Sequence, residues 1–82
     1  MSYEKVKQAK NKKIGTKQSV KALKSGKAEE VFIASDADSK IVKAVIDTAK
    51  QVNIPITYVE SMKDLGKACG IEVGAATVVL VY

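Results

Sequence analysis

A helix expected to begin beside Gly15 has residues in its first turns that could bind a phosphate group. Unpaired backbone N–H groups at a helix start carry a partial positive charge, which normally favours Asp or Glu there. The segment KKIGTKQSVKALKSG, residues 12–26, contains no acid. It offers the hydroxyl of Thr16 and the ammonium groups of Lys17 and Lys21 instead. These groups, with free N–H groups and a glycine that permits close approach, suit a phosphate supplied from outside the protein.

Gln18 adds a group that phosphate binding alone does not require. Its amide can both donate and accept hydrogen bonds, which suits the edge of a nucleic-acid base. At about 100° per residue, Lys17, Lys21 and Lys24 fall within about 60° of one another and form one exposed stripe. Lys24 on that stripe, and Lys13 before the helix, are therefore candidates for further phosphate contacts.

A nucleotide-hydrolysing loop is the competing explanation for the same residues. Gly15, Thr16 and Lys17 resemble part of a phosphate loop, but the pattern GxxxxGK[ST] requires two glycines, and the preceding QAKNKKI contains none. The chain also lacks histidine, which removes the usual general base and metal ligand. We therefore expect no catalytic residue, no metal site and no cofactor, and we do not expect an enzyme.

The charge of the chain is concentrated at one end of the sequence. The net charge is +5, but residues 1–27 carry nine lysines against Glu4 alone, whereas residues 28–82 carry five lysines against eight acids. A basic lobe on a small domain is expected where the partner is a polyanion such as nucleic acid. A lysine-rich surface that only keeps the protein soluble explains the charge count about as well.

A second segment of interest, KACGIEVGAA, places Ile71 and Val73 in a turn bounded by Gly70 and Gly74. The two aliphatic side chains could lie at the surface for contact with a partner. Alternatively, Ile71 could be the hydrophobic contact that follows a glycine helix cap, and Val73 could open the last strand. Periodicity alone favours this structural role. Cys69 is expected to be a small buried residue and not a nucleophile, because no histidine exists to activate it.

Helical and strand patterns alternate along the chain. Ile41, Val45, Ala49 and Val52 repeat at helical spacing, joined by Val42 and Ile46, which predicts a helix that packs one broad apolar face on the sheet. Asp38 or Ser39 is its expected cap, and Pro55 prevents its continuation. Further helices are expected in residues 2–10, in residues 16–26 with Thr16 as the N-cap, and in residues 61–70, where Ser61 and Asp64 have nearly the spacing of a capping box. Strands are expected at residues 31–34, 56–59 and 75–82. This alternation predicts an α/β protein with helices on both faces of a small central sheet.

The length of 82 residues fits one domain, residues 1–82, with one small core. No run of about 18 apolar residues is present, and the N-terminal MSYEKVKQAK lacks the apolar core of a signal peptide. We therefore expect a cytoplasmic monomer that does not contact a membrane.

Taken together, the segments IGTKQSVKAL and LGKACGIEVGAA, with VFIASDAD and IPITYVES between them, closely resemble the ribosomal protein L7Ae family, in particular its short bacterial members of the YbxF type. The resemblance covers essentially the whole chain. It implies a three-layer α/β/α sandwich with a mixed central sheet. It also implies binding to kink-turns, which are RNA helices sharply bent at an internal loop with tandem sheared G·A pairs.

The resemblance assigns a role to each of the two segments. The helix-start motif corresponds to Gly15, Thr16, Lys17, Gln18 and Lys21, with Lys17 and Gln18 facing the G·A pairs and Lys21 held near them. The hydrophobic loop corresponds to Ile71, Glu72 and Val73, which pack against nucleotides flipped out of the bulge.

This chain departs from archaeal and eukaryotic relatives in two places. It has Lys17 and Gln18 where they usually carry Asn-Glu, and Gly74 where many carry proline. The first change replaces specific base contacts with longer or more charge-driven ones, and the second leaves the loop less constrained.

The implied function is therefore recognition and stabilisation of kink-turn RNA, with ribosomal RNA, a riboswitch or another structured RNA as the partner. A different class of function stays open. The chain could be a ribosome-associated protein interaction module with only diffuse affinity for RNA.

Overall fold

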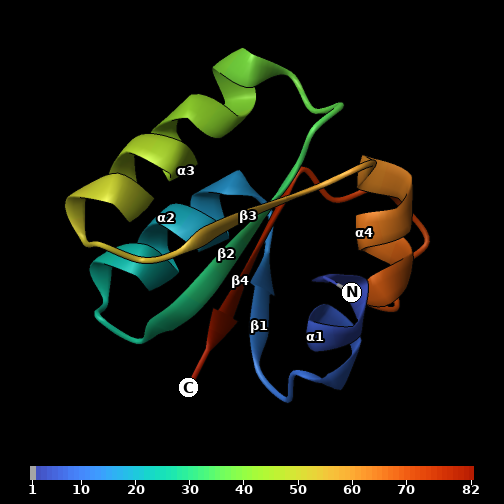
Figure 1. Ribbon diagram of the computed structural model, residues 1–82, viewed down its shortest axis with the longest axis horizontal. Coiled ribbons are helices and arrows are strands. Elements are labelled where there is room, and N and C mark those ends of the chain that lie inside the picture. The colour runs from blue at the N-terminus through green and yellow to red at the C-terminus, as the bar shows by residue number, and fades with distance from the viewer. Residues whose placement is uncertain (1) are drawn as a thin grey trace.

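The computed structural model describes residues 2–82 as an alternating series of helices and strands (Figure 1). In chain order the elements are α1 (Ser2–Gln8), β1 (Lys12–Ile14), α2 (Thr16–Lys24), β2 (Ala28–Ala34), α3 (Ser39–Gln51), β3 (Ile56–Val59), α4 (Met62–Ala68) and β4 (Thr77–Val81). Of the helices in this part of the chain, none combines the length and apolar character that a membrane crossing requires.

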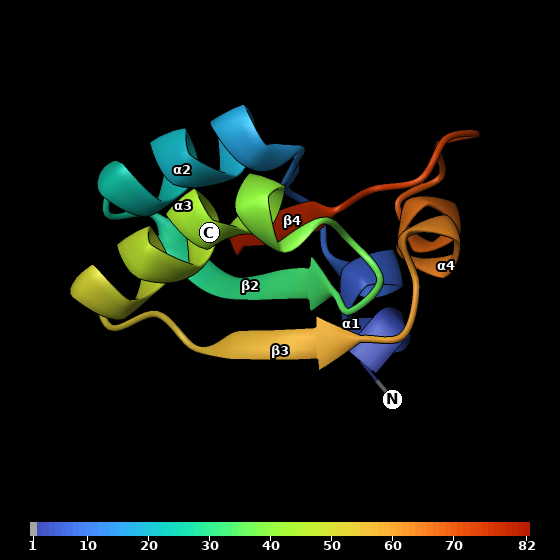
Figure 2. The same cartoon turned by 90° about the horizontal axis from the view of Figure 1, so that it is seen from above.

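The four strands form one mixed sheet in the order β1-β4-β2-β3. Strands β2 and β3 are parallel, whereas β4 runs antiparallel to both of its neighbours, β1 and β2. Helices α2 and α3 cover one face of the sheet, and α1 and α4 lie on the other side (Figure 2). This arrangement confirms the expected α/β/α sandwich with a small mixed sheet.

Each face of the sheet has its own buried cluster, because side chains alternate along a strand. In β2, Val31 and Ile33 pack under α2 and α3, whereas Phe32 and Ala34 pack under α1 and α4. All four side chains are buried, and β4 shows the same alternation. The continuous apolar runs of these strands therefore follow from having helices on both sides.

The buried face of α3 is narrower than its sequence suggests. Val42, Val45 and Ala49 are buried against the sheet as expected, but Ile41 is 53% exposed and Val52 is also exposed. The assignment of Ile41 and Val52 to the buried face was therefore wrong. Ile41 lies about 100° around the helix from Val42, so the rotation that buries Val42 turns Ile41 outward.

Three helices begin at the same end of the sheet, which we call the helix-start end. Strands β1, β2 and β3 run in one direction, so α2, α3 and α4 all start where those strands finish. Asp38 caps α3 by accepting a hydrogen bond from the Lys40 N–H (2.8 Å), and Ser61 caps α4 by accepting from the Asp64 N–H (3.1 Å). Both caps were expected from the sequence.

A polar contact attaches α1 to β2, on the face of the sheet that α1 and α4 cover. The Glu30 carboxylate of β2 accepts hydrogen bonds from Lys5 Nζ (2.7 Å) and from the Thr57 hydroxyl (2.6 Å). Burial alone would raise the pKa of Glu30, but the hydrogen bonds from Lys5 and Thr57 and the charge of Lys5 outweigh it and lower that pKa below its ordinary value. The same hydrogen bond raises the pKa of Lys5.

The lowered pKa of Glu30 makes stability depend on pH in the acid range. A carboxyl whose pKa falls on folding stabilises the protein above its unfolded pKa, near 4.5, and loses this contribution as pH falls through the folded value. We expect Glu30→Gln to lower the free energy of unfolding at pH 7, with the difference from wild type narrowing at pH 3. Urea unfolding at both pH values measures this. If the free energies of unfolding of Glu30→Gln and wild type differ by the same amount at both pH values, the loss of stability comes from packing and not from the charge of Glu30.

Candidate nucleic-acid interface

Helix α2 begins directly after the edge strand β1, and Gly15 makes the connection. Gly15 has a φ of +99°, a backbone conformation that favours glycine. Its N–H donates to the carbonyl oxygen of Thr77 (3.0 Å), and its own carbonyl accepts the first helical hydrogen bond, from the Ser19 N–H (2.9 Å). Gly15 is therefore the N-cap residue, and the assignment of Thr16 as N-cap was wrong, because Thr16 is already the first helical residue.

No side chain among the described residues caps α2. Glycine has no side chain to offer, so the N–H groups of Thr16, Lys17 and Gln18 at the helix start are not satisfied by a cap. Thr16 is half-buried, and Lys17 and Gln18 are exposed. The helix start can therefore donate to an acceptor from outside the protein.

The other two helix starts at this end differ from α2 because each has a carboxylate. Asp38 caps α3, Asp64 lies in the first turn of α4, and Asp36 accepts a hydrogen bond from the N–H of Met62 (2.8 Å). The first turn of α2 has no acid. Of the three helix starts, only that of α2 lacks an internal negative charge.

A buried pair of hydroxyl groups fixes the position of α2. Ser19 Oγ and Thr77 Oγ1 lie 2.9 Å apart within hydrogen-bonding distance, and both residues are fully buried. The pair joins the first turn of α2 to the first residue of β4, so it also aligns Gly15 with that strand. Sequence reasoning missed it, because its members are far apart in the chain and neither belongs to a recognisable motif.

Three of the expected contact residues line one groove beside α2. The groove has a volume of about 300 Å³ and is lined by Lys13, Gln18, Lys21, Ala22, Ser25, Lys27 and Val81. Lys13 enters it because it pairs with Val79 across β1 and β4, and cross-strand partners point to the same face of a sheet. Lys17 and Lys24 are exposed on α2 but do not line this groove. Lys27 was not expected to contribute, since it lies beyond the helix.

The lysines of this region have no internal counter-ion. The ion pairs formed within residues 2–82 are Lys5 with Glu30 and Lys43 with Asp47, both outside the groove. None of the residues that line the groove is acidic. The surface beside α2 is therefore positively charged and able to attract a polyanion.

The second segment forms the turn between α4 and β4. Gly70 ends α4 with a φ of +79°, and the Ile71 N–H donates to the carbonyl oxygen of Gly66 (3.1 Å), as in a glycine-terminated helix. Ile71 is half-buried against the core beside α4, so the structural role considered for it is confirmed. Val73 is 71% exposed, and Glu72 is also exposed. Val73 is thus the aliphatic residue of the turn that presents its side chain to solvent.

The backbone of this turn packs closely on α4. A side chain at Gly66, which is buried in the middle of α4, would overlap the carbonyl oxygen of Val73. A side chain at Gly74 would meet Met62 at 3.1 Å, and the Ala75 N–H donates to the Met62 carbonyl oxygen (3.0 Å). These contacts hold the turn at the helix-start end, where β4 begins.

The start of α2 and the turn lie at the same end of the molecule. The hydrogen bond from Gly15 to Thr77 joins the start of α2 to the start of β4, and the turn leads directly into that strand. Figure 2 shows the red segment before β4 running from α4 toward the start of α2. The fold therefore brings together two segments that are about 55 residues apart in the sequence.

Neither the Cys69 thiol nor a cluster of acidic residues forms a reactive or metal-binding site in residues 2–82. Burial raises the pKa of the Cys69 thiol, and the charge of Lys12 opposes this only in part, so the thiol stays protonated at neutral pH. The side chain packs against the core but is only half-buried, so it is less buried than expected. Within residues 2–82, no group of His, Cys, Asp or Glu is arranged to hold a metal ion.

The sheet order and the helices on both faces define a small α/β/α sandwich, and the uncapped start of α2 and the lysines beside it form a basic surface on it. The chain belongs to the ribosomal protein L7Ae/L30e/S12e/Gadd45 family, whose model matches residues 2–82.

Similar proteins cover nearly the whole chain. It is 58% identical over 81 residues to an RNA-binding protein of Geobacillus sp. strain WCH70, covering 99% of each chain. It is 56% identical over 80 residues to the RNA-binding protein YbxF of Geobacillus stearothermophilus, covering 98% of each. Among solved structures, the Giardia lamblia 15.5kD RNA binding protein superposes with a TM-score of 0.89 at 30% identity, covering 99% of this chain and 71% of that one.

Proposed function

We propose that this protein is a non-catalytic RNA-binding protein that recognises and stabilises kink-turn RNA. The observation that carries the proposal is the uncapped, lysine-flanked start of α2 beside an exposed aliphatic turn. Membership of the family and the relatives named as RNA-binding proteins support the RNA part of the proposal. Recognition of a kink is supported by the position of the turn between α4 and β4, which lies at the same end of the molecule as the start of α2.

The start of α2 suits the bent part of such an RNA. A regular A-form duplex has a major groove too narrow for side chains, whereas a kink opens it. Backbone N–H groups at the start of α2, with Lys21, would neutralise phosphates, and the amide of Gln18 would read a base edge. Lys17 is proposed to lie with Gln18 at the sheared G·A pairs.

The turn supplies the contact that a straight duplex could not make. Nucleotides extruded from a bulge expose base surfaces, and these are recognised by packing against protein side chains. Val73 is exposed and held in place by the packing of the turn on α4, so it is available for such a contact. We assign Ile71 a supporting role and place Glu72 at the edge of the contact.

Binding to the bent form alone would stabilise the kink. A ligand shifts a two-state equilibrium only through its differential affinity for the two states. A protein surface that contacts both an opened groove and flipped nucleotides has a higher affinity for the bent RNA than for the straight one. No cofactor is required. We expect the protein to act in this way as a cytoplasmic monomer, on ribosomal RNA, a riboswitch or another kink-turn RNA.

The proposal is tested by binding to two RNAs that differ only in the G·A pairs. One RNA carries an intact kink-turn, and in the other Watson–Crick pairs replace the tandem G·A pairs, so that the bend cannot form. We expect a marked preference for the first in a gel-shift titration.

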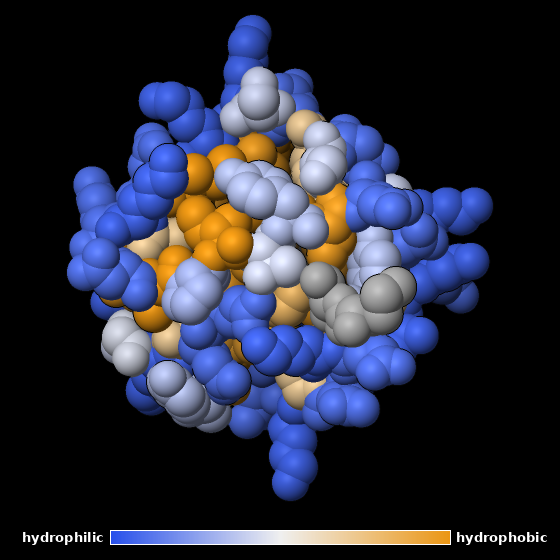
Figure 3. All heavy atoms as spheres, viewed as in Figure 1, coloured by the Kyte–Doolittle hydropathy of each residue, from blue (hydrophilic) through white to orange (hydrophobic). Residues whose placement is uncertain are grey.

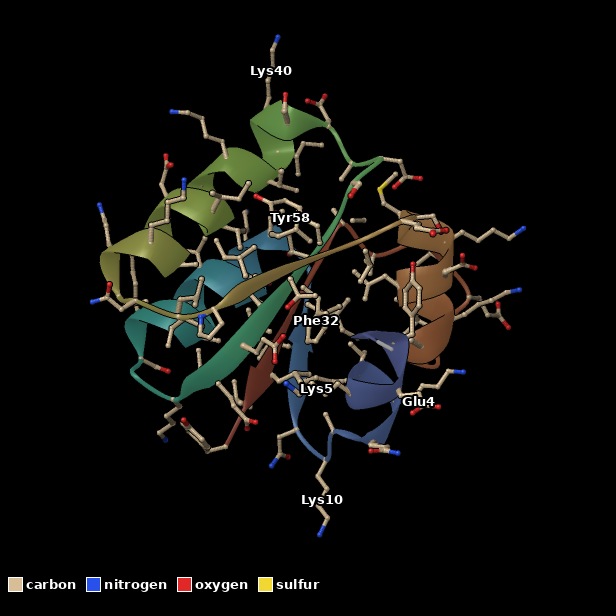
Figure 4. The ribbon with its side chains drawn as sticks, viewed as in Figure 1. Glu4, Lys5, Lys10, Phe32, Lys40 and Tyr58 are labelled. Carbon is tan, nitrogen blue, oxygen red and sulfur yellow. The ribbon has the colours of Figure 1, made fainter. Side chains whose placement is uncertain are left out.

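One observation favours a second candidate function, that of a ribosome-associated protein interaction module. Figure 3 shows apolar side chains gathered over α3 and β3 on one face of the molecule. Among the residues of these two elements, Ile41 and Tyr58 are 53% and 57% exposed, and Figure 4 shows Tyr58 on the same face. The dependence of RNA affinity on salt concentration distinguishes the two candidate functions. Contact with several phosphates makes this affinity fall steeply as the salt concentration rises.

A further inference from the structure

The groove beside α2 continues well beyond the helix start. Gln18, Lys21, Ala22 and Ser25 follow one another at positions i, i+3, i+4 and i+7, which places them along one face of the helix. From Gln18 to Ser25 this face extends about 10 Å at about 1.5 Å per residue. The groove therefore runs along nearly the whole of α2.

The opposite wall of the groove is also basic. Lys13 of β1 and Val81 of β4 form it, and Lys27 lies at the end where α2 has finished. Lys27 is held there by its backbone, because its N–H donates to Ser25 Oγ (3.3 Å) and its carbonyl oxygen accepts from the Tyr82 N–H (3.1 Å).

Nearby acids are on the other side of the sheet. Glu29 lines a different hollow, together with Lys5 and Lys10 of the α1 region. The groove thus combines three ammonium groups, from Lys13, Lys21 and Lys27, with no carboxylate in its lining. Lysine binds phosphate as a point charge, so a row of lysines suits a phosphodiester backbone more than a single shaped ligand.

We infer that one strand of the RNA backbone follows this groove from Gln18 to Lys27, so that the bound surface extends along the full length of α2. This inference rests on the proposed function, because Lys17 and Gln18 set where the G·A pairs lie. From there, the groove extends about 10 Å along α2, so it reaches stem phosphates beyond the G·A pairs. Lys27 is the phosphate contact farthest from the kink, and its contact is independent of base sequence.

The test compares Lys27→Ala with Lys10→Ala, which removes the same charge from an exposed lysine that lines the other hollow, on the α1 side of the sheet (Figure 4). Affinity for the kink-turn RNA is measured over a range of salt concentrations. We expect Lys27→Ala to weaken binding severalfold at low salt and to reduce the log–log salt slope by about 0.7 to 0.9. Lys10→Ala should leave both nearly unchanged, and both variants should keep the preference for kinked RNA.

A neutral methylphosphonate linkage, placed at one stem phosphate at a time, locates the contact. At one stem phosphate beyond the G·A pairs, the neutral linkage should remove the difference between Lys27→Ala and wild type. Equal behaviour of Lys27→Ala and Lys10→Ala would overturn the inference and leave the proposed function standing. A reduced slope in Lys27→Ala without any preference for kinked RNA would overturn the proposed function and support the groove as a general RNA backbone site.

Discussion

Replacing Gly66 with Ala is expected to lower the affinity for kink-turn RNA at least tenfold, although Gly66 lies inside α4 and is buried. The added methyl group would overlap the carbonyl oxygen of Val73, which is backbone and cannot rotate away. Alanine is the better helix former by about 1 kcal/mol, so α4 itself should tolerate the change. The expected result is a turn displaced from the helix-start end, with overpacking costing about 1 to 3 kcal/mol of stability.

The experiment on Gly66 needs both stability and binding. Circular dichroism and thermal unfolding establish that Gly66→Ala is folded at the temperature of the binding assay, and a gel shift then gives its affinity. Val73→Ala is the matched variant, because it removes the exposed side chain without moving the backbone. We expect a smaller loss of affinity from Val73→Ala and no loss of stability. A folded Gly66→Ala protein with wild-type affinity would show that the turn does not contact RNA.

Replacing Lys21 with Ala is expected to cost about 1 to 3 kcal/mol of binding free energy, or roughly 5- to 150-fold in affinity. Lys21 lies on α2 between Gln18 and Ser25 in the groove, and it forms no ion pair within the described residues. Its removal should therefore leave the fold intact while removing a charge from the centre of the proposed binding surface. Fluorescence anisotropy at fixed salt measures the loss, and thermal unfolding checks the stability.

The control for Lys21 is again Lys10→Ala. Lys5 is less suitable, since its ammonium group pairs with Glu30 and its loss would disturb the attachment of α1. Equal and small losses from Lys21→Ala and Lys10→Ala would reduce the surface to a diffuse basic patch. That result would favour the protein interaction module.

Local sequence patterns predict most of the fold. Asp38 and Ser61 cap helices because capping depends on a few neighbouring residues, and the apolar runs of β2 and β4 require helices on both faces. Strand β1 was not expected, because Lys12–Ile14 is too short for a periodic pattern and exists only through its pairing with β4. Pairing between distant strands cannot be predicted from local sequence.

The groove of the proposed binding surface was predicted less completely than the fold. The missing acid at the start of α2 is a local signal, and it identified Lys17, Gln18 and Lys21 as candidates. Lys27 was missed because it lines the groove only where the end of β4 lies beside the end of α2, and that pairing is not a local feature of the sequence. Likewise, the close packing on Gly66 depends on where the turn lies in space, and nothing in the sequence around a helical glycine indicates it.

The central claim is that this protein distinguishes a kinked RNA from a straight one. The most direct measurement is the ratio of dissociation constants for a kink-turn RNA and for the same RNA with Watson–Crick pairs in place of the tandem G·A pairs, at one salt concentration. Binding that depends on an opened groove and flipped nucleotides predicts a ratio of at least tenfold in favour of the kink-turn, about 1.4 kcal/mol. Equal affinity for the two RNAs would contradict it.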